Sequence, residues 1–458
     1  MAYCKACIEK DLKIAKLQET VKGLKAQLRC RDRKEEEGAF GLSTPSSKKP
    51  FKENAPEEKT NKKGGAVPGH KGHGRKSITE EAADLVVDKD AGEICPECGT
   101  PLVPGKETER TVIDNAPMEP KNILYRLHGR ICPNCKKQFK AKAPVLPRSL
   151  YGNAITAQAA VMHYFHGIPM GRICEMTGIN VGSLVDIFHR LGRRFAPCME
   201  ALKNAYRTSP VRHADETGWR NDGQSGYAWL FCTALLSIFL FKNTRSASIP
   251  KGVFGEESLS GVLVVDRYNA YNKLPVKIQY CYAHLLRDLE KLGKDFLDEE
   301  EARSFTGILI PLLSQAMHMG SQNMPDKERY RKAKRLKKQI MKVCRSPARH
   351  LGIRSFQDIF TTHENRLFHW VDDRRVPADN NRAERDLRPT VIARKVSFGS
   401  SSDAGAETRS ILMSALHTLN KSRGKEPLES VFKNILDKIA ENPAADVAAL
   451  ILPSQKQV

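Results

Sequence analysis

The sequence predicts a multidomain protein of the α+β class. Three observations lead to this prediction. The chain has 458 residues, which is more than a single hydrophobic core usually organises. Strand-like runs are concentrated in residues 206–284, whereas long stretches before and after them have the apolar spacing of helices. Two short cysteine pairs form a third pattern that belongs to neither.

The charge of the chain limits its partners. Lys and Arg number 75 against 53 Asp and Glu, which gives a formal net charge of +22 and a pI near 9.5. Such a surface favours a polyanion, and nucleic acid is the first candidate, although a merely soluble basic protein has the same charge. The N-terminal text lacks the apolar core of a secretion signal, and the longest apolar run, residues 228–241, is too short to span a bilayer. We therefore expect a cytoplasmic protein with no membrane partner, whose twelve cysteines are reduced or metal-bound.

Residues 1–37 are predicted to form a coiled coil, which would make the chain a homodimer or higher oligomer. Apolar residues recur there at alternating steps of three and four, although a single amphipathic helix has the same pattern. Residues 38–85 are rich in Lys, Pro, Gly and Ser, and are predicted to be a basic flexible linker. The apolar residues of the coiled-coil pattern are Ile14, Leu17, Val21, Leu24 and Leu28.

Residues 86–147 are predicted to form a zinc-binding ribbon. The segments CPECG and CPNCK each present two sulfurs from one tight turn, and two such turns complete a tetrahedral thiolate site. The four predicted ligands are Cys95, Cys98, Cys132 and Cys135. A site filled by four thiolates leaves no position for catalytic water, so we interpret this zinc as structural.

Residues 148–205 read as helical and resemble a helix-turn-helix. A short apolar helix is followed by a glycine turn near Gly178 and by a second helix that ends in basic residues. A plain helical bundle fits the same text almost as well.

Two acidic residues follow strand-like runs in the next part of the chain. In VRHADETGW the residues alternate, so that His213, Asp215 and Thr217 share one face of a strand with Asp215 towards its end. The run GVLVVD reads as a buried strand, residues 262–265, that carries Asp266 at its carboxyl end. The apolar run 228–241 reads as two strands between them. We therefore expect one sheet with both carboxylates near a common edge, where ligand sites commonly lie.

A third acid lies in PADNNRAERDLRP, where Asp379 or Asn380 is suited to begin a helix. On that helix Asn381, Glu384 and Arg388 share one face, and a surface salt bridge between Glu384 and Arg388 is the simplest interpretation. Together with the two upstream acids, however, Glu384 could complete a set of carboxylates that holds two magnesium ions roughly 4 Å apart.

Several segments at this point resemble a known family. HADETGW, VVDRYNAY, CYAH, DNNRAERDLRP and ARKVSFGSS are similar to motifs of the insertion sequence 66 family of bacterial DDE transposases. The resemblance extends to the N-terminal coiled-coil pattern, to GGAVPGHKGHGR, to the two cysteine pairs and to the C-terminal segment. It covers nearly the whole chain.

The resemblance implies a ribonuclease-H-like α/β catalytic core, formed by residues 206–284 and 362–415, with Asp215, Asp266 and Glu384 as the DDE triad. It further implies two Mg²⁺ or Mn²⁺ ions on this triad, and DNA strand cleavage followed by strand transfer. The partners would be double-stranded DNA, as element ends and as target, and accessory proteins of the same element, and the protein would be associated with the bacterial nucleoid. The long interval before Glu384 implies a helical insertion, residues 285–361, and a helical segment, residues 416–458, would end the chain.

Two groups of basic or polar residues are predicted to contact DNA, and a third pair has a structural role. One group lies beside Glu384 and comprises Asn381, Arg385 and Arg388. The other lies on a strongly basic helix of the insertion, whose narrow apolar stripe leaves Lys334, Arg335 and Lys338 on a broad outer face. Cys281 and His284 match a C-x-x-H motif of related transposases, and we interpret them as holding the start of the insertion near the site.

Three alternative functions share some of these features. A zinc-ribbon DNA-binding regulator would have the charge and the helix-turn-helix but would not need converging acids. A nuclease of the same ribonuclease-H-like fold would cleave DNA without strand transfer. A glycosidase would use paired carboxylates, but a charge of +22 is poorly suited to neutral sugars.

Overall fold

The computed structural model describes four parts of the chain: residues 13–28 except 15, isolated positions between 79 and 101, residues 120–140 except 132 and 134–137, and residues 141–452. The chain divides into two compact units, residues 1–50 with 120–458, and residues 51–119. Most of the predicted basic linker, residues 38–85, lies outside the described residues.

The N-terminal helix carries the predicted apolar stripe on its surface. Residues 16–28 are helical, and the five stripe residues are each between 37% and 56% exposed. On its other side Gln27 donates a hydrogen bond to Glu299 at 3.0 Å and accepts one from the backbone N–H of Leu351 at 3.3 Å. The helix is therefore attached to the rest of the chain while its apolar stripe remains uncovered, and pairing through that stripe stays a prediction.

A short hairpin occupies part of the predicted zinc ribbon. β1 (Gly129–Ile131) and β2 (Gln138–Lys140) pair antiparallel on either side of residues 132–137. Cys95, Cys132 and Cys135 lie outside the described residues, and Cys98 is exposed. The zinc site stays a prediction.

Four helices follow, and a glycine turn separates the second from the third, but their assignment as a helix-turn-helix stays a prediction. Gly178 ends the second helix with φ +70°, a conformation that glycine adopts without strain. Asn180 then begins the third helix, and its side-chain oxygen accepts a hydrogen bond from the backbone N–H of Ser183 at 2.8 Å. The four helices are α3 (Asn153–Tyr164), α4 (Met170–Thr177), α5 (Val181–Phe195) and α6 (Cys198–Thr208).

The centre of the molecule is a mixed sheet of five strands in the order β5-β4-β3-β6-β7. The first three pair antiparallel, whereas β6 is parallel to both β3 and β7. The predicted pair of strands in the apolar run 228–241 is confirmed, with the turn at residues 233–236. The strands are β3 (Val211–Asn221), β4 (Gln224–Cys232), β5 (Ser237–Lys242), β6 (Val262–Val265) and β7 (Lys277–Tyr280).

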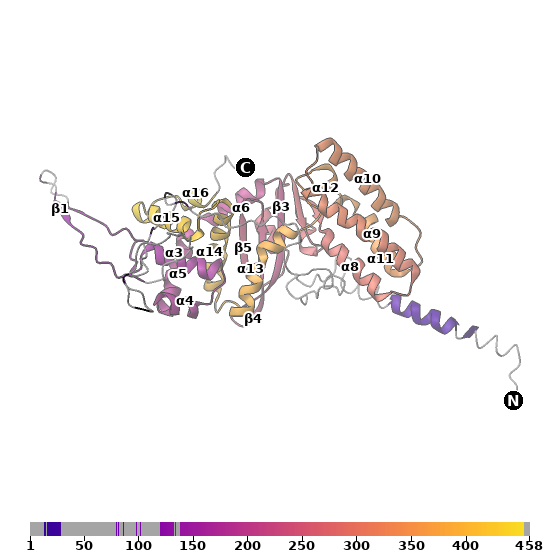
Figure 1. Cartoon of the computed structure of the whole chain (residues 1–458), viewed down its shortest axis with the longest axis horizontal. Coiled ribbons are helices and arrows are strands. Elements are labelled where there is room, and N and C mark those ends of the chain that lie inside the picture. Colours follow the sequence, from indigo (N-terminus) through magenta and orange to yellow (C-terminus); the bar gives the residue numbers. More distant parts are fainter. Residues whose placement is uncertain are drawn as a thin grey trace, which may run out of the picture. The chain divides into compact units, whose positions relative to one another are not determined.

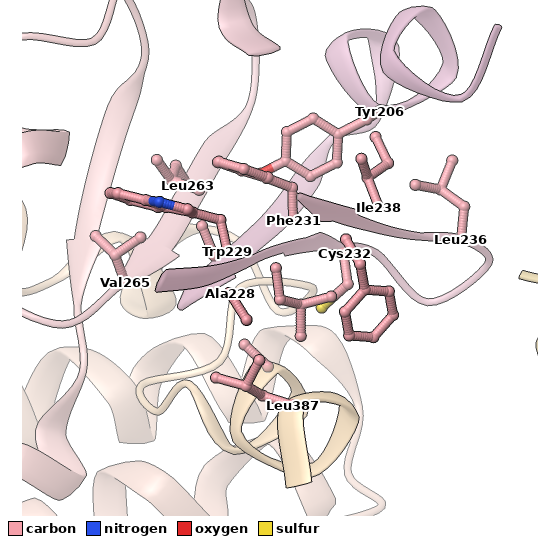
Figure 2. Close-up of a cluster of buried hydrophobic side chains, with 14 of the residues drawn as sticks. Tyr206, Ala228, Trp229, Phe231, Cys232, Leu236, Ile238, Leu263, Val265 and Leu387 are labelled. Carbon is pink, nitrogen blue, oxygen red and sulfur yellow. The ribbon is translucent and has the colours of Figure 1, made fainter. Parts of the chain in front are cut away.

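A helix that precedes the strands in sequence covers one face of the sheet, and a helix that follows them covers the other. Figure 2 shows Tyr206 of α6 on one side of β4 and Leu387 of α13 (Asn381–Ser397) on the other. Both residues are almost fully buried. Burial of each large apolar side chain contributes about 2 kcal/mol, so these contacts fix α13 against the strands. Figure 1 shows α13 lying along the sheet.

The edge of the sheet at β5 is covered by α14 (Asp403–Ser422). Ser410, Ser414 and Thr418 recur every four residues on this helix, and their hydroxyl oxygens accept hydrogen bonds from the backbone N–H groups of Phe241, Phe239 and Ser237 at 3.0, 2.8 and 3.1 Å. An edge strand otherwise leaves these donors open to pairing with another chain. The predicted boundary between residues 415 and 416 falls within this helix.

Residues 285–361, the predicted insertion, form helices joined by short loops. The apolar stripe of its basic helix is buried at Ala333, Leu336 and Ile340, as the sequence pattern indicated. No helix in the described ranges is long and apolar enough to cross a membrane. The helices of this region are α8 (Tyr282–Asp295), α9 (Glu300–His318), α10 (Asp326–Cys344), α11 (Leu351–Thr362) and α12 (His369–Asp372). The remaining helices are α7 (Ser248–Phe254), α15 (Leu428–Glu441) and α16 (Val447–Ile451).

Candidate active site

Asp215 lies on the middle strand of the sheet, on the face that α13 covers. The sequence predicts Asp215 near the end of its strand. However, β3 continues to Asn221, because residues 213–221 pair with β4. The parallel pairing with β6 stops at His213, so Asp215 is the second residue beyond it. His213 and Thr217 contact Asn380 and Arg394 of the α13 segment, at 2.9 and 3.2 Å, which confirms that the predicted residues share one face.

Asp266 follows β6 directly, as predicted, and is buried. One oxygen of its carboxylate accepts a hydrogen bond from the backbone N–H of Tyr268 at 2.9 Å. Because β3 and β6 are parallel neighbours, their consecutive carboxyl-side residues approach one another. The sequence therefore placed Asp266 correctly at the same edge as Asp215.

Glu384 lies in the first turn of α13, where the positive end of the helix dipole favours a carboxylate. Its carboxylate pairs with Arg287 of α8 at 3.1 Å, and not with Arg388 as in the simpler alternative interpretation of the sequence. Its oxygen, the thiol of Cys281 and a ring nitrogen of His284 all lie within 4.8 Å of one another. The C-x-x-H motif and Arg287 thus approach Glu384 from one end of α8.

Asn380 positions the start of α13, a role that the sequence interpretation missed. It was considered only as a helix cap, but its side chain makes no cap hydrogen bond. Instead, its amide donates to the backbone oxygen of Ala214 at 2.8 Å, and its backbone N–H donates to the thiol of Cys281 at 3.1 Å. The capping contact comes from Asp379, which accepts from the N–H of Asn381 at 3.0 Å. No signal in the neighbouring sequence indicates this role, because both partners lie far from Asn380 in the chain.

Several negative charges lie close to the carboxylate of Asp215. Burial, followed by the nearby carboxylates of Glu216, Asp266 and Glu384, raises the pKa of Asp215 well above its usual range. Glu384 and Asp266 come from segments far apart in the sequence, so their joint effect on Asp215 locates all three acids in one region. Among the described residues, these three acids do not bring one oxygen each to within 4.8 Å of one another. Their charges nevertheless suit a divalent cation, and carboxylate oxygens are the ligands that Mg²⁺ prefers.

Glu216 is a fourth carboxylate of this region, buried like Asp215 and Asp266, and the sequence interpretation passed over it. Successive residues of a strand point to opposite faces, so Glu216 lies across the sheet from the side chain of Asp215. There it pairs with Arg245 at 2.6 Å and accepts a hydrogen bond from the hydroxyl of Tyr271 at 2.5 Å. Burial and the nearby Asp266 raise its pKa to about 7, against the effect of Arg245. The guanidinium of Arg245 in turn lies 3.9 Å from the ring centre of Tyr268.

The segment that contains these acids is similar to a known protein family. Residues 148–408 match a protein family described as "Transposase IS66 family", and this range includes all three acids, the whole sheet and the helical insertion. The chain belongs to the IS66 transposase family. The match confirms the resemblance inferred from the motifs, and it extends over more than half of the chain.

Two relatives of this family member come from Sinorhizobium fredii. "Uncharacterized protein y4jD" is 21% identical over 383 residues, which cover 75% of this chain and 74% of the relative. "Uncharacterized protein y4qI" is 23% identical over 357 residues, which cover 69% of this chain and 64% of the relative. Neither name indicates a substrate or a partner.

The residues predicted to contact DNA are on the surface of this IS66 transposase. Asn381, Arg385 and Arg388 are exposed on one side of α13, whereas Asp386 turns inward and pairs with Lys421 at 2.6 Å. Lys334, Arg335 and Lys338 are exposed on α10. The side of α10 that bears Lys334 and Lys338 borders a shallow concavity, whose other lining residues are Lys337, Met341, Lys342, Arg345 and Glu364.

The raised pKa of Glu216 predicts how stability depends on pH. Between the ordinary value of 4.5 and about 7, the folded protein binds more protons than the unfolded chain, so this contribution is present at low pH and is lost as pH rises to 7. We expect Glu216→Gln to remove this decrease in stability with rising pH. In the presence of EDTA, the Tm of the variant minus that of the wild type should grow as pH increases through this window. A difference that is constant or falls with pH would contradict the assignment.

Proposed function

We propose that this family member is the catalytic transposase that binds the ends of its insertion element and performs Mg²⁺-dependent strand cleavage and strand transfer with Asp215, Asp266 and Glu384. The observation that carries the proposal is electrostatic. The carboxylates of Asp266, which follows β6, and of Glu384, at the start of α13, add to burial in raising the pKa of Asp215 on β3, as expected when the three acids lie close together. The antiparallel strands β3 to β5, with β6 and β7 parallel to β3, support a ribonuclease-H-like core.

The residues present fit a divalent metal. Asp215 and Asp266 are buried acids, and a bound cation would stabilise their ionised forms. Glu384 would be the third ligand once it is released from Arg287. When bound, Mg²⁺ or Mn²⁺ supplies activation of the attacking oxygen and charge neutralisation at the phosphate. The alternative ligand set, Cys281 with His284 and Glu384, suits such a hard ion less well, because burial raises the pKa of the Cys281 thiol to about 12.

The chain's own residues then position the DNA. The three carboxylates define where the scissile phosphate must lie, and Arg385 and Arg388 bind the neighbouring phosphates from the exposed side of α13. Arg287 lies within reach of Glu384, and it can transfer from that carboxylate to the phosphate when DNA enters. Asn380 keeps the start of α13 fixed to β3 during this exchange.

Two reactions would use this region in sequence. First, the oxygen of a water attacks the phosphorus at the element's end, and the bond from phosphorus to the 3′ oxygen breaks, which leaves a 3′-hydroxyl and a 5′-phosphate. Next, that 3′-hydroxyl attacks a phosphodiester of the target and displaces its 3′ oxygen, so one phosphodiester forms as another breaks. The protein forms no covalent bond to DNA.

Further parts of the chain would assist binding. The concavity beside α10 supplies cations for a second stretch of the phosphate backbone. The zinc ribbon at Cys95, Cys98, Cys132 and Cys135, with the β1–β2 hairpin on either side of its second cysteine pair, and the helix-turn-helix of α4 and α5 would add DNA contacts. The N-terminal stripe would join two copies, so that two element ends are held together, with accessory proteins of the element as further partners.

A strand-transfer assay tests the function. Purified protein is incubated with end-labelled DNA that contains the ends of its element, with Mg²⁺ and with a target plasmid. We expect nicks at the element ends and labelled products joined to the plasmid, and none of either in EDTA. Nicks without joined products would instead indicate a nuclease, and binding without nicks would indicate a DNA-binding regulator.

A further inference from the structure

One face of α13 leads from the acids to an exposed aromatic residue that has no role in the proposed reaction. Arg385, Arg388, Ile392 and Lys395 recur at steps of three and four, and all are exposed. The helix ends at Ser397, and the next residue, Phe398, is 74% exposed. We refer to these five residues as the α13 stripe. It carries three positive charges and no negative one.

Phe398 is held in an unfavourable backbone conformation. Its φ of 60° is in the left-handed region, which a bulky side chain rarely adopts. Burial does not explain this conformation, since the ring is largely in solvent. Strained conformations that the surrounding structure enforces are concentrated at binding and catalytic sites.

The loop that presents Phe398 is fixed to the sheet. The backbone N–H of Ser400 donates to the oxygen of Arg220 at 2.9 Å, and the ring N–H of Trp219 donates to the Ser400 hydroxyl at 3.1 Å. Gly399 lies so close to Arg220 that a Cβ would stand 2.2 Å from its backbone oxygen. The outward direction of Phe398 is therefore built into the end of β3, the strand that carries Asp215.

The charge of the stripe identifies the kind of partner. Cations at successive turns of one helix face match the spacing and charge of a phosphate backbone, whereas a purely apolar partner would leave them desolvated. The acid nearest to Phe398 in sequence, Asp403, is engaged by the side-chain amide of Asn221, and Asp386 beside Arg385 pairs with Lys421. An exposed aromatic ring at the end of a cationic track offers a stacking surface for a base.

The length of the helix sets the position of that base. Glu384 and Phe398 are fourteen residues apart, and a rise of 1.5 Å per residue separates them by roughly 21 Å. At about 3.4 Å per base pair, this distance corresponds to about six base pairs of duplex. A ring can stack on the face of a base only where that base has lost its neighbour, so the DNA must be opened there.

We propose that Phe398 stacks on an unpaired base of the DNA substrate about six base pairs from the scissile phosphate, with the cations of the α13 stripe holding the backbone between. This inference rests on the proposed function, because it uses Glu384 to mark the cleavage position. It adds a specific contact that stabilises distorted DNA over intact duplex.

The experiment uses full-length protein and a duplex of the element end that carries the fluorescent adenine analogue 2-aminopurine. The analogue is placed about six base pairs from the terminal phosphate on either strand, or at about twice that distance as a reference. Binding is measured in Ca²⁺, which allows complexes to form without cleavage. We expect a fluorescence change at the near position alone, on one of the two strands.

Three variants make the test specific. Phe398→Ala should abolish the fluorescence change and weaken binding about 10-fold, whereas Phe398→Trp should restore both. Phe398→Gly should raise Tm, because glycine relieves the backbone strain, and yet bind as weakly as the alanine variant. Leu297→Ala removes another exposed apolar side chain, 63% exposed, and should change none of these properties.

The outcomes separate this proposal from the proposed function. If Phe398→Ala keeps the wild-type signal and affinity, or if it changes only the oligomeric state, the stacking contact is refuted even when the protein cleaves and joins DNA. If the wild type gives the position-specific signal in Ca²⁺ but no products in Mg²⁺, the stacking surface stands and the catalytic assignment fails.

Discussion

Glu384→Gln should abolish nicking and strand transfer while DNA binding is retained. The substitution removes one negative charge from the first turn of α13 but preserves the shape of the side chain and an oxygen that can still accept from Arg287. The loss of one group that stabilises charge at the reacting phosphate typically lowers the rate by about 10² to 10³-fold. We therefore expect a decrease of at least about 10²-fold in the rate of Mg²⁺-dependent nicking, measured on end-labelled DNA in single-turnover reactions.

The matched control is Glu407→Gln, which removes an acid that is exposed on α14. Both variants change the net charge equally, so any general effect on DNA affinity should be the same for the two. The control should nick and join DNA as the wild type does. Robust cleavage by Glu384→Gln, with a normal Tm for both variants, would show that Glu384 is only a structural partner of Arg287.

Asp215→Asn should also eliminate cleavage, but it should stabilise the metal-free protein. The pKa of Asp215 is raised because the ionised form is buried beside three other carboxylates. At pH values where the wild type must ionise this group, asparagine avoids that unfavourable charge and can still accept the hydrogen bond from the backbone N–H of Glu216. We expect a rise in Tm of roughly 2 °C or more in EDTA, together with a loss of nicking of about 10³-fold.

Added Mg²⁺ should raise the Tm of the wild type and have little effect on Asp215→Asn. The control is Asp222→Asn, at the exposed turn between β3 and β4, where asparagine tolerates the local φ of 49°. This control should keep both the cleavage activity and the response to Mg²⁺. Lower stability of metal-free Asp215→Asn would mean that the carboxylate contributes more to the fold than its crowded charges indicate.

The strand-borne acids were predictable because strand periodicity and strand ends are local properties of the sequence. Asp266 follows β6 at the predicted position, and the alternation around Asp215 correctly assigned His213 and Thr217 to its face. Likewise, the apolar stripe of α10 indicated which of its residues are buried. Each of these inferences needs only a few neighbouring residues and one repeat length.

The contacts of Glu384 and Asn380 were not predictable in this way. Glu384 pairs with Arg287, which lies 97 positions away, instead of Arg388 one turn along the same helix. Asn380 bonds across 166 positions to Ala214. No short-range pattern distinguishes these partners from others, because they result from the crossing of α13 with β3 and α8. Glu216 was missed for a related reason: its partners become close only when the sheet forms.

Two hydrogen bonds near the ends of the helical insertion affect how far the length of this segment can change. The N–H of Tyr282 donates to the oxygen of Ala378 at 2.8 Å, and the N–H of Asn380 donates to Cys281, so the two ends of the segment 283–377, which contains the insertion, meet at one place. A segment whose ends already meet can be lengthened, shortened or replaced without moving what it joins. The acids on either side would stay aligned even if the helices between them changed in length.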